Sequence, residues 1–402
     1  MQRFLFSAAL CLPLAVQAAE QTQIERGQYL ARAADCVACH STAGSAPYAG
    51  GLPLQSPFGT IYGSNITPDK QYGIGNYSSD DFYNAVAKGK RADGSNLYPA
   101  MPYTSYHLIK REDSDAIYAY LMSIEPIARP APSTSLSFPF NLRFGLSAWN
   151  QLYAGDLQLA PATDKSAQWQ QGQYLVEVLG HCGECHTPRN SLGALQQDQA
   201  MQGGVLLGYL APSLKTEDML ARGWNSADLS TFLRHGISAQ GSMFNEMYPV
   251  LHNSSQYLSD ADHQAMATYL LGEQPGPAAL IATQPLAQLT ESAQQGRQDY
   301  LNVCAGCHGN EGQGVPHVAV AMEGNTTLRQ ADSRNLLRVI EDGIAEQQFT
   351  GFERMQPMPG FAEQLSAEQL RNLLNYLRQT WGGLPADMNT AQVSELRSQV
   401  GH

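Results

Sequence analysis

Three copies of one five-residue motif, Cys-x-x-Cys-His, constrain this chain more than any other feature. The copies begin at Cys36, Cys182 and Cys304, so they lie 146 and 122 residues apart. Such spacing is typical of separate domains, because repeat arrays have periods of about 20–50 residues. A chain of 402 residues also has room for about three domains of ordinary size.

Each motif presents two thiols a fixed reach apart, followed directly by an imidazole. This arrangement forms two thioether bonds to the vinyl groups of a haem and carries the histidine onto the iron. A zinc site or a redox disulfide also uses Cys-x-x-Cys, but a following His, repeated three times in an exported chain, favours haem. We therefore predict three covalent haem c groups. The attachment cysteines are Cys36, Cys39, Cys182, Cys185, Cys304 and Cys307, and the proximal ligands are His40, His186 and His308.

A haem that only transfers electrons needs a sixth ligand, and a methionine sulfur raises its potential relative to histidine. The predicted methionines are Met101, Met247 and Met358, which follow the motif histidines by 61, 61 and 50 residues. Prolines beside Met101 and Met358 stiffen their loops. Met243 is a rival of Met247, and Met355 is a rival of Met358. Each proximal histidine is expected to be neutral, with its remaining ring N–H bonded to a backbone carbonyl.

Helical signals surround each motif and predict a mostly α fold. A Tyr-Leu pair precedes each motif at about helical spacing, at 29–30, 174–175 and 300–301. Each unit closes with a second apolar helix, at 117–121, 267–271 and 373–377. Serines followed by acids at 78–81, 226–228, 259–262 and 366–368 predict helix starts. The two helices of a unit are expected to cross at small residues and to form the wall of a haem pocket.

Composition predicts where the domains end. Pro-rich or polar stretches separate the helical segments, and proline prevents them from being helical throughout. The expected order is a signal peptide at 1–18, a first domain at 19–125, a linker at 126–165, a second domain at 166–273, a linker at 274–289, a third domain at 290–382 and a polar tail at 383–402.

The first 18 residues predict export. Arg3 precedes an apolar run that ends with Val16 and Ala18 at the small-residue positions of a cleavage site. No later stretch approaches the ~20 apolar residues of a membrane-spanning helix. The formal charge of −12 argues against nucleic acid as a partner, because phosphate binding requires excess Lys and Arg. An acidic surface instead favours solubility, or steers a basic partner protein.

Other side chains leave two interpretations open. Haem propionate contacts or ordinary loop packing would suit Asn65, Thr67, Tyr77, Arg189 and Trp224. Surface or packing roles, rather than iron ligation, are expected of His107, His235, His252 and His317, because none is matched across the three units. A docking or membrane-surface patch, or packing between domains, would suit the aromatic residues Phe138, Phe140, Phe144, Trp149 and Tyr153.

With these sites placed, the chain resembles the tri-haem cytochrome c subunits of membrane-associated bacterial alcohol, gluconate, sorbitol or fructose dehydrogenases. The stretches that carry the resemblance are 26–30, 57–60, 64–69, 73–75, 97–103, 141–145 and 181–189, and it covers nearly all of the mature chain. The resemblance implies three tandem class I cytochrome c domains joined by Pro-rich linkers. It also implies the cysteine, histidine and methionine roles given above.

The resemblance further implies an electron-transfer subunit without a substrate-oxidising site of its own. Electrons would pass from a flavoprotein or quinoprotein dehydrogenase subunit through three haems to ubiquinone. The chain would then lie in the periplasm, attached peripherally to the membrane surface. Two other functions remain open from the residues alone. One is a stand-alone periplasmic shuttle, and the other is a multi-haem enzyme with one open haem, for which the loop of Met243 and Met247 is the candidate place.

Overall fold

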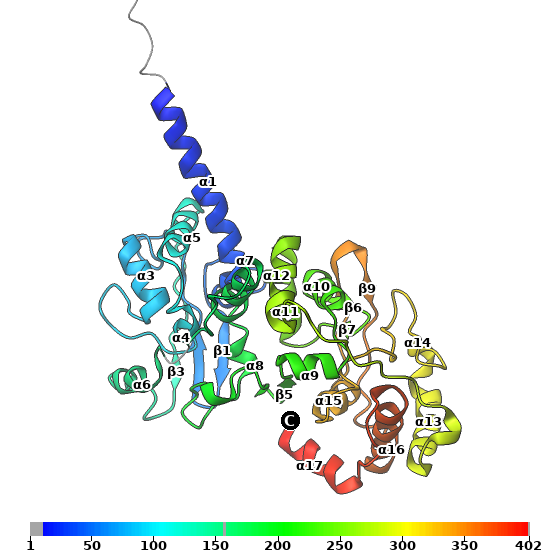
Figure 1. Ribbon diagram of the computed structural model, residues 1–402. Helices are drawn as coiled ribbons and strands as arrows, with labels where there is room; N and C mark the ends of the chain where they lie inside the picture. Colours follow the sequence, from blue (N-terminus) through cyan, green and yellow to red (C-terminus); the bar gives the residue numbers. More distant parts are fainter. Residues whose placement is uncertain (1–10, 156–157, 401–402) are drawn as a thin grey trace, which may run out of the picture. The chain divides into compact units, whose positions relative to one another are not determined.

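The computed structural model describes residues 11–155 and 158–400, and helices account for far more of them than strands do (Figure 1). The mostly α prediction is therefore confirmed. Of the predicted signal peptide, residues 1–10 lie outside the described residues. The chain divides into two compact units. The first runs to Leu159 and takes in Glu177–His181, and the second contains Ala160–Val176 and the chain from Cys182 onward.

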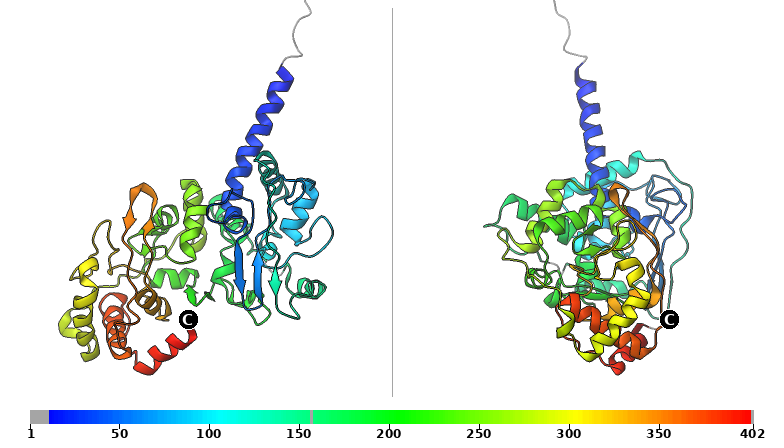
Figure 2. Two further views of the ribbon diagram at one scale, coloured as in Figure 1. Left: turned by 180° about the vertical axis from the view of Figure 1, so that it is seen from behind. Right: turned by 90° about the vertical axis from the view of Figure 1, so that its right-hand side faces the viewer.

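The first unit combines helices with a small antiparallel sheet (Figure 2). Its helices are α1 (Cys11–Ala33), α2 (Cys36–His40), α3 (Ser79–Lys88), α4 (Tyr103–Tyr106), α5 (Arg111–Ser123) and α6 (Gly145–Tyr153). Its strands are β1 (Pro53–Ser56), β2 (Gly59–Tyr62) and β3 (Ser135–Leu136), in the order β1-β2-β3. Leu54 pairs with Ile61, and Gly59 pairs with Leu136. The segment predicted as a linker thus supplies an edge strand to the first unit.

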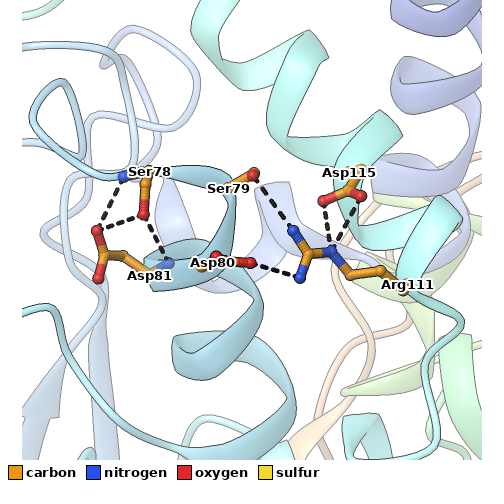
Figure 3. Close-up of polar contacts among 6 residues, drawn as sticks. All are labelled: Ser78, Ser79, Asp80, Asp81, Arg111 and Asp115. Atoms are coloured by element: carbon orange, nitrogen blue, oxygen red, sulfur yellow. Dashed lines mark hydrogen bonds and ion pairs between the residues drawn. The ribbon is translucent and has the colours of Figure 1, made fainter.

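Helix α3 begins where the serine and acids at 78–81 predict a helix start (Figure 3). The Ser78 hydroxyl accepts a bond from the backbone N–H of Asp81, whose carboxylate accepts a bond from the backbone N–H of Ser78. This capping box satisfies donors that the first turn leaves free. Arg111 at the start of α5 then joins the two helices, at 2.6 Å from the Asp80 carboxylate and 2.8 Å from that of Asp115 (Figure 3).

The second unit contains the remaining helices and three two-stranded hairpins. Its α-helices are α7 (Ala167–Gln173), α8 (Gly183–His186), α9 (Thr216–Ala221), α10 (Ser226–His235), α11 (Met247–Asn253), α12 (Asp260–Leu271), α13 (Glu291–Val303), α14 (Ala305–His308), α15 (Arg334–Asp342), α16 (Ala367–Leu377) and α17 (Thr390–Val400). The hairpins pair β4 (Gly204–Leu206) with β5 (Tyr209–Ala211), β6 (Ile237–Ser238) with β7 (Gly241–Ser242), and β8 (Gln347–Gln348) with β9 (Arg354–Met355).

Single turns of other helix types complete the fold, and all four 3₁₀ turns among the described residues lie in the second unit. The 3₁₀ turns are Gln197–Gln199, Ser255–Tyr257, Leu286–Gln288 and Thr350–Phe352. Two π-helical turns follow regular helices, at Tyr174–Leu179 after α7 and at Arg378–Gly382 after α16. The stretch that precedes the second motif is therefore helical, as expected, but its hydrogen-bond spacing widens just before Cys182.

Three pairs of helices cross in the same way. The pairs are α1 with α5, α7 with α12, and α13 with α16. One glycine lies at each crossing: a Cβ added at Gly27, Gly172 or Gly296 would lie 1.9, 1.9 or 2.0 Å from the backbone oxygen of Ala116, Ala265 or Asn372. Only glycine lets the backbones approach so closely. The predicted crossing at small residues is confirmed in all three places.

The end of the chain folds rather than trailing as its polar composition suggests. Residues 390–400 form helix α17, and Val393 is fully buried. It lies in a cluster with Leu370, Leu377 and Trp381 from the end of the third predicted domain. Asn375 fixes the approach, because its side-chain amide bonds both the N–H and the C=O of Met388. In the part of the chain that the structure describes, no helix has the length and apolarity needed to cross a membrane.

The second and third motif regions belong to one compact unit, and buried amides join them. The Asn335 side chain pairs with both backbone groups of Leu210, at 2.8 Å each. The Gln347 side chain donates to the carbonyl of Met243 at 2.8 Å. Each amide side chain supplies the hydrogen-bond partner of a backbone group. Without that partner, the buried backbone group would be unsatisfied, which costs free energy.

Candidate haem sites

Each Cys-x-x-Cys-His motif forms a short helix. Residues at positions i, i+3 and i+4 of a helix lie on one face, so both sulfurs and the imidazole of a motif point to one side. The three helices are α2, α8 and α14, and the first cysteine of the second and third motifs caps its helix. All six cysteines are free thiols. Local geometry alone therefore gathers the attachment groups that the sequence predicts.

The imidazole of every motif is held by a backbone carbonyl, as predicted. The Nδ1 atoms of His40, His186 and His308 lie 2.6, 2.7 and 3.1 Å from the carbonyl oxygens of Ser64, Pro212 and Val320. Since a carbonyl only accepts, each Nδ1 carries the proton and each Nε2 is left with a free lone pair. Burial lowers the pKa of all three histidines, which keeps them neutral. A neutral ring with Nε2 available is the form that binds iron.

A second contact, which the sequence analysis missed, also repeats at every site. The backbone carbonyl of each motif histidine accepts a bond from a glycine N–H, from Gly50, Gly203 and Gly314, at 2.7, 2.8 and 2.8 Å. All three glycines have positive φ, at 73°, 92° and 72°. The left-handed turn brings the following chain back over the motif helix. The available sequence signal was a glycine 10 residues after His40, 17 after His186 and 6 after His308, a spacing too irregular to read.

The cysteine environments argue against a redox disulfide. Burial raises the pKa of Cys36 and Cys304 to about 12. Reactive dithiols instead need a lowered pKa, because the thiolate is the attacking form. These thiols therefore lack the electrostatic support of a thiol–disulfide exchange site.

The third motif opens onto a pocket that fits a haem. The pocket has about 680 Å³ of empty space, part of which is open to solvent. Its wall contains Cys304, Cys307 and His308, together with both predicted methionines, Met355 and Met358. The rest of the lining is largely apolar and includes Val303, Val318, Ile344, Pro357, Pro359 and Phe361. The donor set and the apolar wall agree with a covalently attached porphyrin.

Met358 and Met355 are held differently within that pocket. Met358 exchanges both backbone hydrogen bonds with Ile344, at 2.9 and 2.8 Å, between two prolines. Met355 lies on β9 and is 8% exposed. Both side chains reach the pocket wall, so the structure keeps the two candidates that the sequence left open.

In the first unit, Met101 lies in a tight turn directly before α4. The Met101 N–H bonds the carbonyl of Tyr98, and the Met101 carbonyl accepts from Tyr103, at 3.1 and 2.7 Å. Tyr103 is fully buried and anchors the turn through its hydroxyl, which lies 2.7 Å from Asn150 of α6. The sulfur is thus carried on a loop with little freedom, which a ligand requires.

At the second site the two methionines have contrasting surroundings. Met243 is 1% exposed, and its backbone is bonded on both sides, to Gly236 at 2.7 Å and to Gln347 at 2.8 Å. The preceding Ser242 lines the third pocket, whereas Met243 does not. Met247 is half-buried at the first position of α11. Met243 is therefore the better-held sulfur, although the 61-residue spacing predicts Met247.

The residues for which propionate contacts and loop packing were both left open make contacts with other protein groups that agree with loop packing. Asn65 donates to the carbonyls of Ile127 and Arg129 and accepts from Thr67. Arg189 pairs with the carboxylate of Glu184 at 2.6 Å. The carbonyl of Tyr77 accepts from Tyr118, and the Trp224 indole lies 3.3 Å from the Thr326 hydroxyl.

The unmatched histidines likewise have surface or packing contacts. His107 bonds the carbonyl of Thr104, and His317 pairs with Glu353 at 3.4 Å. His235 bonds Thr350, and the His252 ring lies edge-on to Tyr248. The expectation that these four histidines are surface or packing residues agrees with their positions.

Comparison with known proteins identifies the family. The family model for cytochrome c matches residues 24–125 and 293–381, which contain the first and third motifs. The cytochrome c subunit of alcohol dehydrogenase (quinone) from Gluconacetobacter polyoxogenes is 36% identical over 98% of this chain and 89% of its own length. The gluconate 2-dehydrogenase cytochrome c subunit of Pantoea cypripedii is 37% identical over 96% of this chain and 91% of its own. The fructose dehydrogenase cytochrome subunit of Gluconobacter japonicus is 34% identical over 94% of this chain and 84% of its own length.

The helical fold, the carbonyl-bonded motif histidines and the family match together define a cytochrome c, a protein that binds haem c covalently. Because relatives above 30% identity span nearly its whole length, this chain belongs to the family of cytochrome c subunits of alcohol, gluconate and fructose dehydrogenases. The resemblance seen in the sequence is confirmed.

Proposed function

We propose that this chain is the electron-transfer subunit of a dehydrogenase complex and carries three haem c groups in three tandem domains. The repetition of one histidine environment carries the proposal. At all three motifs the ring Nδ1 bonds a carbonyl, and the histidine carbonyl accepts from a left-handed glycine. A motif that matched by chance would have no reason to be built with the same two contacts as the others.

The haem supplies reversible one-electron transfer at the iron, and the chain supplies orientation and burial. The proximal ligands are His40, His186 and His308, each turned by its carbonyl partner so that Nε2 is free. The proposed distal ligands are Met101, Met358 or Met355, and Met243 or Met247. The Cys pairs fix each haem to its motif helix.

The relatives' names support the partners. They describe subunits of alcohol, gluconate and fructose dehydrogenases, and one of those enzymes is named for quinone. We infer that a flavoprotein or quinoprotein subunit delivers electrons to this chain and that ubiquinone receives them. The export signal that the sequence predicts at 1–18 supports a periplasmic location, attached peripherally to the cytoplasmic membrane.

Haem counting tests the three sites directly. The wild-type chain, produced with a c-type haem maturation system, is expected to contain three haems per chain. Replacing one cysteine pair with serine, for example Cys182→Ser with Cys185→Ser, is expected to leave two. The same replacement at 36 and 39, or at 304 and 307, serves as the matched comparison. A wild-type count below three contradicts the proposal.

Purification from native membranes in mild detergent tests the role. We expect a larger cofactor-bearing dehydrogenase subunit to co-purify, and one alcohol, sugar or sugar acid to reduce all three haems until a ubiquinone analogue reoxidises them. A chain that purifies alone and is reduced by no substrate contradicts the subunit role and favours a free shuttle. Rapid carbon monoxide binding at one reduced haem would instead indicate an enzyme with an open iron.

A further inference from the structure

Helix α6 has two apolar faces, and only one of them is covered. Leu146 is buried on the inner face, and the Trp149 ring lies edge-on to Tyr103 with centroids 6.5 Å apart. This face holds the turn that carries Met101. An apolar face left in water costs free energy, so a second apolar face is expected to be covered.

The outer face of α6 instead points into solvent. Phe144, Ala148 and Leu152 follow at intervals of four residues, so they form one row along the helix. Phe144 is 78% exposed and Leu152 is 62% exposed. No residue of α6 is charged.

The chain just before α6 carries further exposed apolar side chains. Phe138 is 78% exposed, and Phe140 and Leu142 are 40% and 38% exposed. Consecutive turns, with bonds from Phe140 to Ser137, from Leu142 to Pro139 and from Gly145 to Leu142, keep this stretch compact. We call these five side chains, Phe138, Phe140, Leu142, Phe144 and Leu152, the apolar row.

The segment 126–155, which contains the apolar row, has a net positive charge, whereas the chain as a whole is acidic. The chain has 36 acidic residues against 24 basic ones, yet no Asp or Glu occurs from 126 to 155, while Arg129 and Arg143 do. Lys90 adds another cation beside α6, because its ammonium bonds Asn96, whose amide lies 3.0 Å from Ser147 of the helix. Exposed Phe and Leu beside cations are typical of segments that lie in the interface of an anionic bilayer.

We propose that the apolar row is a membrane-binding surface, which inserts into the headgroup region of an anionic phospholipid bilayer. The inference rests on the proposed function and deepens it, because it selects the first unit as the part that meets the membrane. Tyr103 and Trp149 connect the inner face of α6 with the Met101 turn. The first haem site is therefore the one braced against the membrane-facing helix.

A lipid surface suits this row better than a partner protein does. The five side chains have no polar atom, whereas protein interfaces combine apolar anchors with about one hydrogen bond per 100–200 Å². The local excess of cations is complementary to the negative charge of lipid phosphate groups. The same cations would not select one partner protein over another.

Co-sedimentation of the full, haem-loaded chain with vesicles tests the proposal. We expect binding to phosphatidylcholine vesicles that contain phosphatidylglycerol, weaker binding to pure phosphatidylcholine, and loss of the difference at high salt. The double variant Phe144→Ser/Leu152→Ser is expected to bind at least about tenfold more weakly, because both side chains would leave the bilayer. Its haem content and melting temperature are expected to equal those of the wild type.

The matched control is Leu280→Ser/Leu286→Ser, which removes two other apolar side chains that are 100% and 49% exposed. This control is expected to bind vesicles as the wild type does. The proposal is overturned if the wild type does not bind, if the control loses as much binding as the row variant, or if the row variant binds vesicles normally but no longer co-purifies with a dehydrogenase. The last outcome would assign the row to a protein partner. The haem count is unaffected by every one of these results, so it tests the proposed function separately.

Discussion

Met243 and Met247 show how one residue position can decide the chemistry of a site. Spacing favours Met247, while burial and two backbone bonds favour Met243. A ligand on iron must hold its position against thermal motion, and rigid surroundings supply that hold.

We therefore expect Met243→Leu to remove the methionine–iron absorption band of one haem and to lower its potential, with the haem still attached. Met247→Leu, the matched variant, is expected to keep both. Visible spectroscopy and redox titration of the two variants measure the difference. Loss of the band in the Met247 variant alone would show that the sequence spacing was the better guide.

His263 gives a pH-dependent effect at the same scale. It is 1% exposed, its Nε2 bonds the carbonyl of Ser255, and its Nδ1 has no hydrogen-bond partner. Burial is the main cause that lowers its pKa below 6.5. The charges of Arg234 and His235 lower the pKa further, whereas the charge of Asp262 raises it. The unfolded chain therefore takes up the proton first as the pH falls.

Because the folded pKa is lowered, the stabilisation is complete above pH 6.5 and is lost as the pH falls through 6.5 toward the folded pKa. We expect His263→Gln, which can still donate to Ser255, to lose less stability than the wild type between pH 7.5 and 5.5. The difference is at most about 1.4 kcal/mol, because only one pH unit of this range lies below 6.5. Urea unfolding at the two pH values measures it, and equal losses in both proteins would contradict the assignment.

At the scale of elements, the repeated helix crossing sets the geometry of each site. The first helix leads into the motif, and the last helix carries the backbone oxygen that the glycine contacts. The distance between the two helices is thus coupled to the position of the motif.

Gly296→Ala is expected to destabilise the second unit, because the new methyl group would lie 2.0 Å from the carbonyl oxygen of Asn372. Overpacking of this kind costs ~1–3 kcal/mol. Gly145→Ala is the control, since nothing lies within 4 Å of its added Cβ, and it is expected to be neutral or slightly stabilising. Thermal unfolding of the two variants compares them. A Gly296 variant as stable as the wild type would mean that the helices separate at no cost.

Much of this local architecture was predictable. The Ser-acid signals at 78–81, 259–262 and 366–368 do begin α3, α12 and α16, because a cap needs only residues within one turn. The signal at 226–228 is displaced by one residue, since Asn225 rather than Ser226 caps α10. The short hairpins were not predicted, because strands of two to four residues have no readable alternation.

At the scale of the whole molecule, the second and third motif regions are joined while the first unit is separate. The three predicted domains are similar in sequence pattern, so nothing in the pattern distinguishes the two connections. Asn335 and Gln347 are among the residues that join these regions, and each bonds backbone groups more than 100 residues away.

We expect calorimetry to resolve two unfolding transitions, one for each unit. Asn335→Ala is expected to lower the free energy of unfolding of the second unit by ~1–3 kcal/mol. Both backbone groups of Leu210 would lose their hydrogen-bond partner in a buried place. Asn76→Ala removes an exposed amide that is bonded to Lys70 in the first unit. This variant is expected to leave the transition of the first unit unchanged. A single transition for all three regions would contradict the division into two units.

The sequence by itself determined the parts of this protein that depend on neighbours along the chain. The spacing of two cysteines and a histidine creates an attachment face on any helix, and serine caps and Tyr-Leu pairs define the helices around it. Only the tertiary structure decided which carbonyls orient His40, His186 and His308, which sulfur is best held at the second site, and that α17 returns to cover a core. The physical reason is range. A motif is fixed by contacts between residues close along the chain, whereas the carbonyls that orient its histidine lie 12 to 26 residues away and are selected by packing.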